Sequence, residues 1–451
     1  MARARYPVVS LFSGALGLDL GLERAGLTIA VAVECNRFAA ETIRKNRPDI
    51  PLIEDRIEGV TTEEILETAG LAPGEPFVVT GGPSCQAFST AGQRGSVGDP
   101  RGLMFREFLR VVEEAQPRFF VMENVRGVLS AAVRHRPLNE RGPGFPPLEP
   151  DEELGSALIL MLEELSATGY HTVFDVVNAA DYGVPQTRER VLFVGSRDGE
   201  LVSMPEPTHA KDLGAARDKH DWVSLGVALE GLVDSEPEYA DFTPSKKKFI
   251  KLVPEGGNWR HLPPKKRAEA LGGAHASWGG RGGFMRRLAW DRPAPALTTR
   301  PDCKATMMCH PSETRPLSVR ECARIQQFPD DWEFAGGLPQ KYIQVGNAVP
   351  VGLGEAVGRA ILNTARKRKR VKEMGVVVCA DDDLLERLAN RPSTILNPIR
   401  MRKVKTPGAA KAWLNGGRQH RSQILDYVSR PDDIEAAVPK VRRRRRGGAR
   451  R

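Results

Sequence analysis

Short apolar runs that end in glycine or in a polar residue alternate with longer segments of helical periodicity over the first half of the chain. The runs are "PVVSLF" (7–12), "LTIAVAVE" (27–34), "PFVVTGG" (76–82) and "RFFVMENV" (118–125). Amphipathic segments such as "GLMFREFLRVVEEA" (102–115) lie between them. Strands that alternate with helices predict an α/β fold with an open, mostly parallel sheet covered by helices on both faces.

The alternation fails between about 200 and 290, where glycine, proline, lysine and tryptophan are frequent. A stretch such as "KKKFIKLVPEGGNWRHLPPKK" indicates an irregular, basic second lobe. Two helical segments, "SVRECARIQQFP" and "VPVGLGEAVGRAILNTARK", then close the folded part, and a charged extension with one or two helices, such as "DDDLLERLAN", follows. The expected boundaries are a first domain over 1–200, a second lobe over 201–300, a return to the first domain over 301–368 and a basic extension over 369–451.

The composition of the 451-residue chain is that of a soluble, folded protein, with 41% hydrophobic and 27% charged residues. Six cysteines are spread thinly without a CxxC pair, so we expect free thiols, no disulfide framework and no metal site. The N-terminal sequence "MARARYPVVSLFSGALG" lacks the apolar length of a signal peptide or a membrane span. These features predict a protein of the reducing cytoplasm without a membrane partner.

The net charge of +9 favours a polyanionic partner without identifying it. Basic residues are concentrated in "ARKRKRVK" (365–372) and in "VRRRRRGGARR" (441–451). A solvated tail explains such runs as well as a nucleic-acid site does, so both interpretations stay open.

A glycine-rich turn follows the first apolar run, with Gly14, Gly17 and Gly21 in it, and Glu34 ends the second run. In dinucleotide-binding folds, such a turn lets the backbone approach a cofactor while the acid binds ribose hydroxyls. The spacing GxxGxxxG differs from GxGxxG, so a nicotinamide cofactor is not favoured. A tight corner without any cofactor is an equally good interpretation of these glycines alone.

Four residues at other predicted strand ends carry potential chemistry. Cys85 follows "FVVT" at the carboxyl edge of the sheet, where open α/β folds bind ligands. Because a free thiol is only about 3% thiolate at pH 7, a nucleophilic role needs a nearby positive charge or helix N-terminus. Glu123 suits proton transfer or a bond to a ring nitrogen, and Arg188 and Arg190 of "QTRER" project to one face. Each of the three charged residues alone is equally compatible with a surface salt bridge or a polar strand end.

Taken in order, these motifs resemble those of the DNA (cytosine-5) methyltransferase family over most of residues 8–365. The resemblance is carried by "LFSGALGLDLGLERAG", "GGPSCQAFSTAGQRG", "DPRGLMF", "ENV", "QTRERVLFVG", "RPAPALTTR", "RECARIQQFPDDW" and "QVGNAVP". It implies a Rossmann-like S-adenosylmethionine methyltransferase fold with a small, irregular target-recognition lobe. The catalytic and cofactor-binding domain would then be 1–200 with 301–368, and the target-recognition domain 201–300.

The resemblance also implies a role for each residue. Cys85 would attack carbon 6 of a flipped-out cytosine, and carbon 5 would then accept the methyl group. Glu123 would bond ring nitrogen 3 and the exocyclic amine, Arg188 would hold the other edge of the base, and Arg190 would support the site. The residues expected to hold S-adenosylmethionine are Phe12, Gly14 and Gly17 beneath it, Glu34 at the ribose hydroxyls, Asp55 at the adenine amine and Asn347 closing the pocket.

Three positions depart from the pattern of the family. Leu16 replaces a glycine and Ser84 replaces the second proline of the nucleophile motif, but neither change removes a reacting group. Cys35 stands where an aromatic residue often packs against the adenine. The departures leave the predicted reaction intact and place the adenine contact in question.

The predicted function is sequence-specific cytosine-5 methylation of double-stranded DNA by a monomer, in the cytoplasm and associated with the nucleoid through DNA. Protection of host DNA from a cognate restriction endonuclease is the expected purpose. One alternative is a tRNA cytosine-5 methyltransferase of the same fold. The intact spacer of about 90 residues, from about 200 to 290, and the lack of a Cys-Phe-Thr signature after the last strand disfavour it. A catalytically inactive DNA-binding regulator is the other, but Cys85, Glu123 and the arginines are all present.

Overall fold

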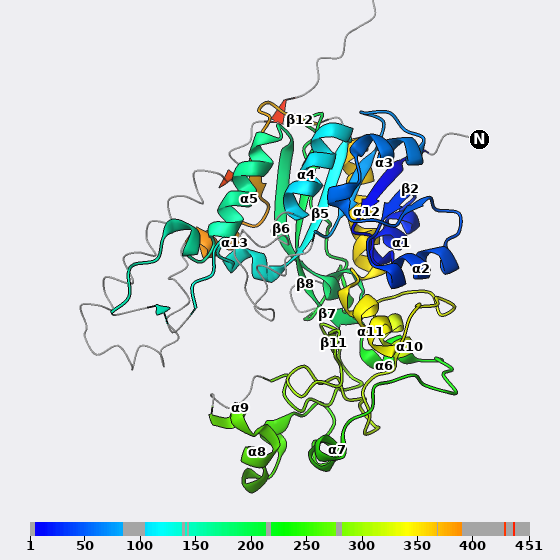
Figure 1. Cartoon of the computed structure of the whole chain (residues 1–451), viewed down its shortest axis with the longest axis vertical. Coiled ribbons are helices and arrows are strands. Elements are labelled where there is room, and N and C mark those ends of the chain that lie inside the picture. Colours follow the sequence, from blue (N-terminus) through cyan, green and yellow to red (C-terminus); the bar gives the residue numbers. More distant parts are fainter. Residues whose placement is uncertain are drawn as a thin grey trace, which may run out of the picture.

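The computed structural model describes residues 5–83, 104–137, 140–141, 144–212, 218–276, 282–367, 369–389, 428–429 and 436–437. Figure 1 shows a sheet flanked by helices in the upper part of the view and a smaller, irregular lobe below it.

The central sheet is built mainly from parallel strands. Its strands are β1 (Pro7–Leu11), β2 (Thr28–Val33), β3 (Leu52–Ile53), β4 (Val78–Gly81), β5 (Phe119–Val125), β6 (His171–Asn178), β8 (Glu189–Ser196), β13 (Val377–Cys379) and β14 (Val428–Ser429). They lie in the order β14-β13-β6-β8-β5-β4-β1-β2-β3. All neighbours are parallel except β8, which runs antiparallel to β5 and to β6. The predicted open, mostly parallel sheet is confirmed.

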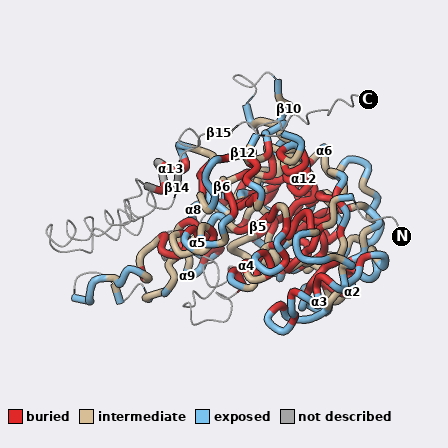
Figure 2. The backbone as a smooth tube through the Cα atoms, turned by 90° about the horizontal axis from the view of Figure 1, so that it is seen from above, coloured by how far each residue is buried: buried red, intermediate tan, exposed pale blue. Residues whose placement is uncertain are grey.

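Helices cover both faces of this sheet. They are α1 (Gly17–Arg24), α2 (Arg37–Asn46), α3 (Thr62–Ala69), α4 (Met104–Ala115), α5 (Ser156–Ala167), α12 (Val351–Arg366) and α13 (Asp382–Ala389). One apolar cluster joins the sheet to α3, α4, α5 and α13, and a second joins it to α1, α2 and α12. Figure 2 shows the buried backbone gathered around the sheet and α12. Strands covered on both sides explain why the runs in the sequence are almost continuously apolar.

The strand order fixes where a ligand can bind. From β1 the chain moves outward to β2 and β3, and it then crosses to β4 on the other side of β1. In open α/β sheets such a reversal leaves a crevice at the carboxyl ends of the two central strands. The crevice therefore lies between the turn after β1 and the turn after β4.

The second lobe is irregular, as the sequence predicts. Its short helices are α6 (Leu225–Leu229), α7 (Pro244–Ile250), α8 (Pro264–Leu271) and α9 (Gly273–Ala276), and the strand β11 (Ala294–Pro295) pairs with β7 (Gln186–Thr187). It has its own apolar core, formed by Phe242, Phe249, Ile250, Val253, Leu262, Ala270, Met285, Met307 and Cys309. Because Met307 and Cys309 belong to this core, the lobe extends past the expected boundary at residue 300.

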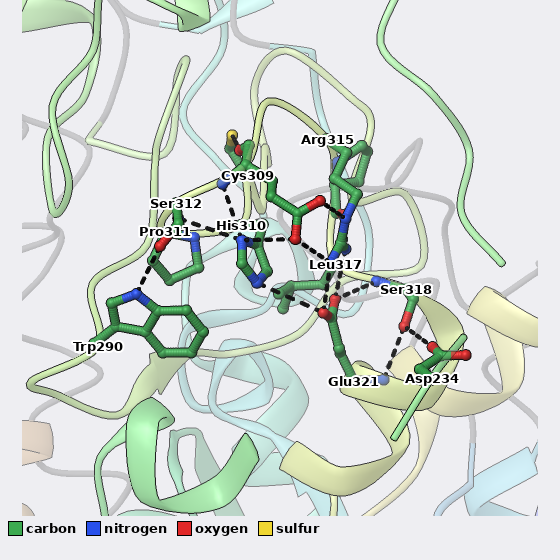
Figure 3. A network of polar contacts seen from close by, with 12 residues as sticks. Asp234, Trp290, Cys309, His310, Pro311, Ser312, Arg315, Leu317, Ser318 and Glu321 are labelled. Atoms are coloured by element: carbon green, nitrogen blue, oxygen red, sulfur yellow. Dashed lines mark hydrogen bonds and ion pairs between the residues drawn. The ribbon is translucent and has the colours of Figure 1, made fainter. Parts of the chain in front are cut away.

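A buried polar network fixes the chain where the lobe returns to the first domain (Figure 3). Arg315 donates to the two carboxylate oxygens of Glu321 at 2.9 and 2.8 Å. Glu321 also accepts from the backbone N–H of Ser318 at 2.7 Å, which caps α10 (Val319–Ile325). The Ser318 hydroxyl donates to Asp234 at 3.0 Å. Because removal of one member of a buried ion pair costs about 3–5 kcal/mol, loss of either Arg315 or Glu321 is expected to destabilise this junction.

Part of the segment that the sequence analysis treats as a basic extension belongs to the first domain. β13 pairs with β6 in parallel, and the helix expected within "DDDLLERLAN" is α13. Val377, Cys379 and Leu384 are buried in the same apolar cluster as α4 and α5. A boundary at residue 369 is therefore too early, because β13 extends the sheet at the β6 edge. The basic run at 441–451 lies outside the described residues.

Within the described ranges, no helix combines the length and the apolarity that crossing a bilayer requires.

Asp19 in the first turn of α1 makes the stability of the fold depend on pH. Its side chain is buried, and burial raises its pKa to about 7, against the opposing effect of a hydrogen bond from Ser10. Because the pKa is higher in the folded state than in the unfolded chain, the folded state binds more protons between pH 4 and 7. The stabilising contribution is thus present at pH 4 and is lost as the pH rises through 7.

We expect Asp19→Asn to be more stable than the wild type at pH 8, by roughly 2 to 4 kcal/mol, with the difference disappearing near pH 4. Urea unfolding at a series of pH values measures this. The same substitution at Asp291, whose side chain is 82% exposed, is the control and should leave the pH dependence unchanged. Parallel pH profiles for Asp19→Asn and the wild type would contradict the prediction.

Candidate active site

The turn after β1 holds the carboxylate of Glu34 in place. The backbone N–H of Gly14 donates to Glu34 Oε2 at 2.7 Å, and that of Asn36 donates to Oε1 at 2.7 Å. Burial raises the pKa of Glu34, and these N–H groups oppose the shift. A Cβ atom added at Gly14 would have no heavy atom within 4 Å, so this side of the turn faces open space. The geometry suits a ligand with hydroxyl groups.

Gly17 and Gly21 serve a different purpose from Gly14. A Cβ at Gly17 would lie 2.3 Å from the carbonyl oxygen of Val349, and one at Gly21 would lie 2.2 Å from that of Val351. Both glycines therefore allow α1 to pack closely against the start of α12. The open space at Gly14 is compatible with the predicted ligand turn, which stays a prediction, whereas packing explains the other two glycines. A cofactor contact through the backbone of Gly17 stays a prediction.

Asp55 and Asn347, predicted to complete the same pocket, have exposed side chains. The backbone N–H of Glu34 donates to the Ile53 carbonyl at 3.1 Å, so Asp55 follows β3 at the same edge of the sheet as Glu34. Asn347 is the last residue of α11 (Leu338–Asn347), next to the segment that packs on Gly17. The structure thus brings all the predicted cofactor residues to one end of the sheet.

The predicted nucleophile Cys85 lies outside the described residues, because the described segment before it ends at Pro83. The carbonyl of Pro83 accepts from Asn124 Nδ2 at 3.4 Å. A Cβ at Gly82 would lie 3.1 Å from Glu123 Oε2. Two residues before Cys85, the chain is therefore bound to the end of β5, beside the carboxylate of Glu123.

Glu123 forms an ion pair with Arg190 from the neighbouring strand β8. Glu123 is 8% exposed, and its Oε1 lies 2.5 Å from Arg190 Nε. The Nε–H of Arg190 has no hydrogen-bond partner among the described residues, so this contact is an ion pair without a hydrogen bond. Arg190 also donates from Nη1 to the Glu189 carbonyl at 2.8 Å. The carboxylate is thereby held at the start of the segment that leads to Cys85.

Arg188 is buried and is held mainly by carbonyl groups. Its Nη2 donates to the Gly346 carbonyl at 2.9 Å, and its Nη1 donates to the Leu297 carbonyl at 3.2 Å. Burial and the charge of Arg190 hold the pKa of Arg188 well below its usual range, although the charge of Glu123 opposes them. Among the described residues, Arg188 Nε has no hydrogen-bond partner. The site therefore keeps a buried donor that a ligand oxygen could satisfy.

Two buried glutamines orient Arg188. Gln326 Nε2 donates to the carbonyls of Val345 and Ala348 at 2.7 and 3.1 Å, so its Oε1 must face Gln186. Gln186 Nε2 donates to that oxygen at 2.9 Å. Gln186 Oε1 is then left to accept from the Leu297 N–H at 2.9 Å and from Arg188 Nη1 at 3.4 Å. Carbonyl groups, which cannot donate, thus determine the orientation of both amides.

Sequence reasoning missed the role of Gln326. The neighbouring Gln327 has the same side chain, but it is only partly buried and bonds Gly183 and Gly352 instead. The available signal was an uncharged polar pair, Gln326 and Gln327, between the apolar residues Ile325 and Phe328. Such a signal indicates that a residue has buried partners without naming them.

The strand order, the crevice beside β1 and the carboxylate–guanidinium cluster beside β5 define an α/β enzyme of the methyltransferase fold. The family described as C-5 cytosine-specific DNA methylase matches residues 6–363. The chain belongs to this family and is a DNA (cytosine-5) methyltransferase, as the motifs predict. As a methyltransferase, it takes the methyl group from a donor of the S-adenosylmethionine type.

Known relatives agree with this membership. The chain is 36% identical over 360 residues to the type II methyltransferase M.Sau96I of Staphylococcus aureus, with 79% of this chain and 76% of that one covered. It is 38% identical over 371 residues to the type II methyltransferase M.PspPI of Psychrobacter sp. (strain TA137), with 80% and 81% covered. The tRNA enzyme and the inactive regulator are not favoured.

The fold also agrees with a solved structure. A putative DNA modification methyltransferase encoded within an Escherichia coli prophage superposes with a TM-score of 0.54. The two are 23% identical, and the alignment covers 80% of this chain and all of the other. At this identity the likeness shows the fold alone.

The orientation of Arg188 by Gln186 can be tested by substitution. We expect Gln186→Leu to lower kcat/KM for DNA by about 10- to 100-fold, equivalent to about 1.4–2.8 kcal/mol, because the three hydrogen bonds of the Gln186 side chain are lost, one of which is to Arg188 itself. Cofactor affinity should change less than twofold. Gln327→Leu is the matched control, since its hydrogen bonds lie outside this chain of contacts, and its activity should remain near that of the wild type. Equal losses in both variants would refute the role of Gln186.

Proposed function

We propose that this protein transfers a methyl group from S-adenosylmethionine to carbon 5 of a cytosine that is flipped out of a specific duplex DNA sequence. The observation that carries the proposal is the meeting of Pro83, Glu123, Arg188 and Arg190 at the carboxyl edge of the sheet. Pro83 precedes Cys85 by two residues. The proposed nucleophile, the group that binds the base and the buried guanidinium thus belong to one site.

The proposed roles follow from the charge that develops on the base. The Cys85 thiolate forms a bond to carbon 6, and the electron pair displaced from the 5,6 double bond makes carbon 5 nucleophilic. Glu123 bonds ring nitrogen 3 and the exocyclic amine, and Arg190 keeps that carboxylate in position. The free N–H of Arg188 binds the other edge of the ring. After carbon 5 has taken the methyl group, a base or water removes the carbon 5 proton, and the electron pair left behind re-forms the 5,6 double bond and expels the Cys85 thiolate from carbon 6.

The residues of the crevice fit S-adenosylmethionine. Its sulfonium carries the electrophilic methyl group that the reaction requires. The open side of Gly14 leaves space for the donor above the turn that includes Phe12 and Gly17. Each oxygen of Glu34 accepts one backbone N–H and keeps a lone pair for a ribose hydroxyl. In this proposal Asp55 binds the adenine amine, and Asn347 closes the pocket.

The wider setting is also proposed. Residues 201–300, together with the part of the lobe beyond them, would recognise the DNA sequence, and the protein would act as a monomer in the cytoplasm, associated with the nucleoid through DNA. The type II methyltransferases among its relatives support a cognate restriction endonuclease. Bisulfite sequencing of DNA from cells that express the chain identifies the methylated base and its sequence together. Light scattering reports the oligomeric state.

The covalent step has a direct test. A duplex with 5-fluorocytosine at the target position should form a stable adduct with the wild type, because carbon 5 then has no proton to lose. Cys85→Ala should form no adduct and should lower methyl transfer by at least about a thousandfold. Tritiated donor measures the transfer, with total tRNA as the alternative substrate. Label in tRNA alone, or an adduct with Cys85→Ala, would overturn the proposal.

The role proposed for Glu34 is in binding the methyl donor, so it can be tested separately from the methyl-transfer step. We expect Glu34→Gln to raise the KM for S-adenosylmethionine about tenfold, with kcat changed less than twofold, since a charge-assisted bond to a hydroxyl becomes a neutral one. Glu164→Gln is the matched control, because Glu164 lies on α5 and pairs with Arg106 at 2.7 Å. Initial rates at saturating DNA measure both. An unchanged KM for Glu34→Gln would remove Glu34 from the pocket.

A further inference from the structure

Asp19 is a buried acid to which the proposed reaction assigns no role. It lies in the first turn of α1, two residues after Gly17, and is only 2% exposed. Among the residues that the structure describes, its Oδ1 has no hydrogen-bond partner. The cation that acts on it, Arg47, forms its ion pairs with Glu23 and Asp49 instead.

Two serine hydroxyls connect Asp19 to the turn after β1. Ser10, in β1, makes a side-chain hydrogen bond to Asp19. The hydroxyl oxygens of Ser10 and Ser13 lie 2.9 Å apart. Ser13 directly precedes Gly14, and its N–H donates to the Val33 carbonyl at 3.2 Å. Asp19 is therefore two hydrogen bonds away from the turn proposed to bind the methyl donor.

The number of protons fixes the direction of this chain of hydrogen bonds. An ionised carboxylate has no proton to donate, so Ser10 donates to Asp19, and Ser13 must then donate to Ser10. A protonated Asp19 can donate to Ser10 instead, which reverses the chain. The Ser13 hydroxyl is then left to donate to the carbonyls of Ser10 or Val33, at 3.1 and 3.3 Å. The ionisation of Asp19 thus determines the hydrogen bonds of Ser13.

The other charged groups that face Asp19 oppose one another. Glu23, one turn later in α1, raises the pKa of Asp19, and Arg47, which follows α2, lowers it. Glu23 and Arg47 also pair with each other. α12 packs against α1 at Gly21 through backbone atoms. Burial is the largest effect and raises the pKa of Asp19 to about 7, so this acid changes its charge near neutral pH.

A carboxylate in this position lowers the stability of the fold once it ionises. Burial penalises its charged form, whereas asparagine has nearly the same shape and no charge. Buried groups whose pKa values are strongly displaced occur preferentially at functional sites. Asp19 is therefore a candidate for a role that an uncharged side chain does not fill.

The methyl donor supplies a reason for this charge. S-adenosylmethionine has a positively charged sulfonium, whereas the sulfur of its product, S-adenosylhomocysteine, is an uncharged thioether. A negative charge in the protein attracts the donor more than the product, and it does so more strongly where water is excluded. The chain of hydroxyls polarised toward Asp19 extends this preference to the turn.

We propose that Asp19 is a positioning residue for the methyl donor, whose ionised carboxylate acts through Ser10 and Ser13 to set the turn after β1 for a cationic ligand. This inference rests on the proposed function, since it concerns the same donor. Binding of a cation favours the ionised acid, so affinity for the donor rises with pH as Asp19 loses its proton. Below that range the chain is reversed, and the preference for donor over product disappears.

Equilibrium binding tests this inference without the methyl-transfer reaction. In titration calorimetry with the full-length protein and no DNA, the Kd of the wild type for S-adenosylmethionine should fall about 3- to 10-fold more between pH 6 and 8 than that of Asp19→Asn. Donor binding at pH 7 should release more protons from the wild type, by up to about half a proton, which buffers of different ionisation enthalpy reveal. The Kd for S-adenosylhomocysteine should differ less than about twofold between the two proteins at either pH.

Two further variants serve as controls. Asp291→Asn changes a side chain that is 82% exposed, and it should keep the pH profile of the wild type. Ser10→Ala keeps the carboxylate but removes the hydrogen bond that favours its ionised form, so the midpoint of the profile should move to higher pH. Retained affinity of Asp19→Asn for S-adenosylhomocysteine separates a lost charge from lost folding.

Parallel pH profiles of the wild type and Asp19→Asn for S-adenosylmethionine would overturn the inference. Equal pH dependence for donor and product would do so as well, because the effect would then be independent of the sulfonium. An unchanged midpoint in Ser10→Ala would exclude transmission through Ser10. A wild type that binds neither ligand at any pH would instead reject the proposed function.

Discussion

The buried chain of contacts from Gln326 through Gln186 to Arg188 is the constraint on which the site depends. These hydrogen bonds connect residues 186–188 to Leu297. Through Arg188 and Gln326 they also connect this segment to residues 345–348, at the carbonyls of Val345, Gly346 and Ala348. Each partner is neutral, so the charge of Arg188 is left without full compensation. The nearest opposing charge is that of Glu123, which Arg190 already neutralises in part. A site of this kind is preorganised for negative charge, because its donors are fixed before the ligand arrives.

Close packing of glycines connects this chain to the crevice for the methyl donor. Gly346 accepts from Arg188 through its carbonyl, and a Cβ on it would lie 2.8 Å from the backbone of Thr298. A few residues later, the 348–351 segment packs against Gly17 and Gly21. The segment between Gly346 and α12 therefore touches the pocket for the base at one end and the first turn at the other. Movement of either pocket must displace this segment.

The sequence predicted the edges of the sheet better than the interior contacts. Glu34 and Glu123 were placed correctly because hydrophobic runs locate strands, and a polar residue at the end of such a run must lie at the edge. The use of Gly17 for packing could not be predicted, since a glycine shows only that something comes close. The contrast between Gln326 and Gln327 has the same origin, because burial depends on segments distant in sequence. The strand β13 was missed although "VVVCA" (376–380) is an apolar run of the kind that forms buried strands, because the run is short and stands inside a segment dominated by charged residues.

The turn after β1 shows how the chain tolerates a departure from its family. Phe12, Gly14 and Leu16 all have positive φ angles, of 53°, 54° and 66°, and only one of them is glycine. A left-handed conformation costs a residue with a side chain about 1–2 kcal/mol. Burial of a leucine contributes about 1.5–3 kcal/mol, and Leu16 is completely buried, so its packing offsets the strain.

Phe12 has no such compensation from full burial, since its ring is only half-buried. Its conformation is imposed by the residues around it. Ser13 N–H bonds the Val33 carbonyl, Leu16 N–H bonds the Ser13 carbonyl and Gly14 N–H bonds Glu34. Backbone strain that is maintained by surrounding contacts is typical of ligand-binding sites. The turn is therefore held in one shape by Glu34, the residue proposed to bind the ribose, which couples the conformation of the pocket to its own ligand contact.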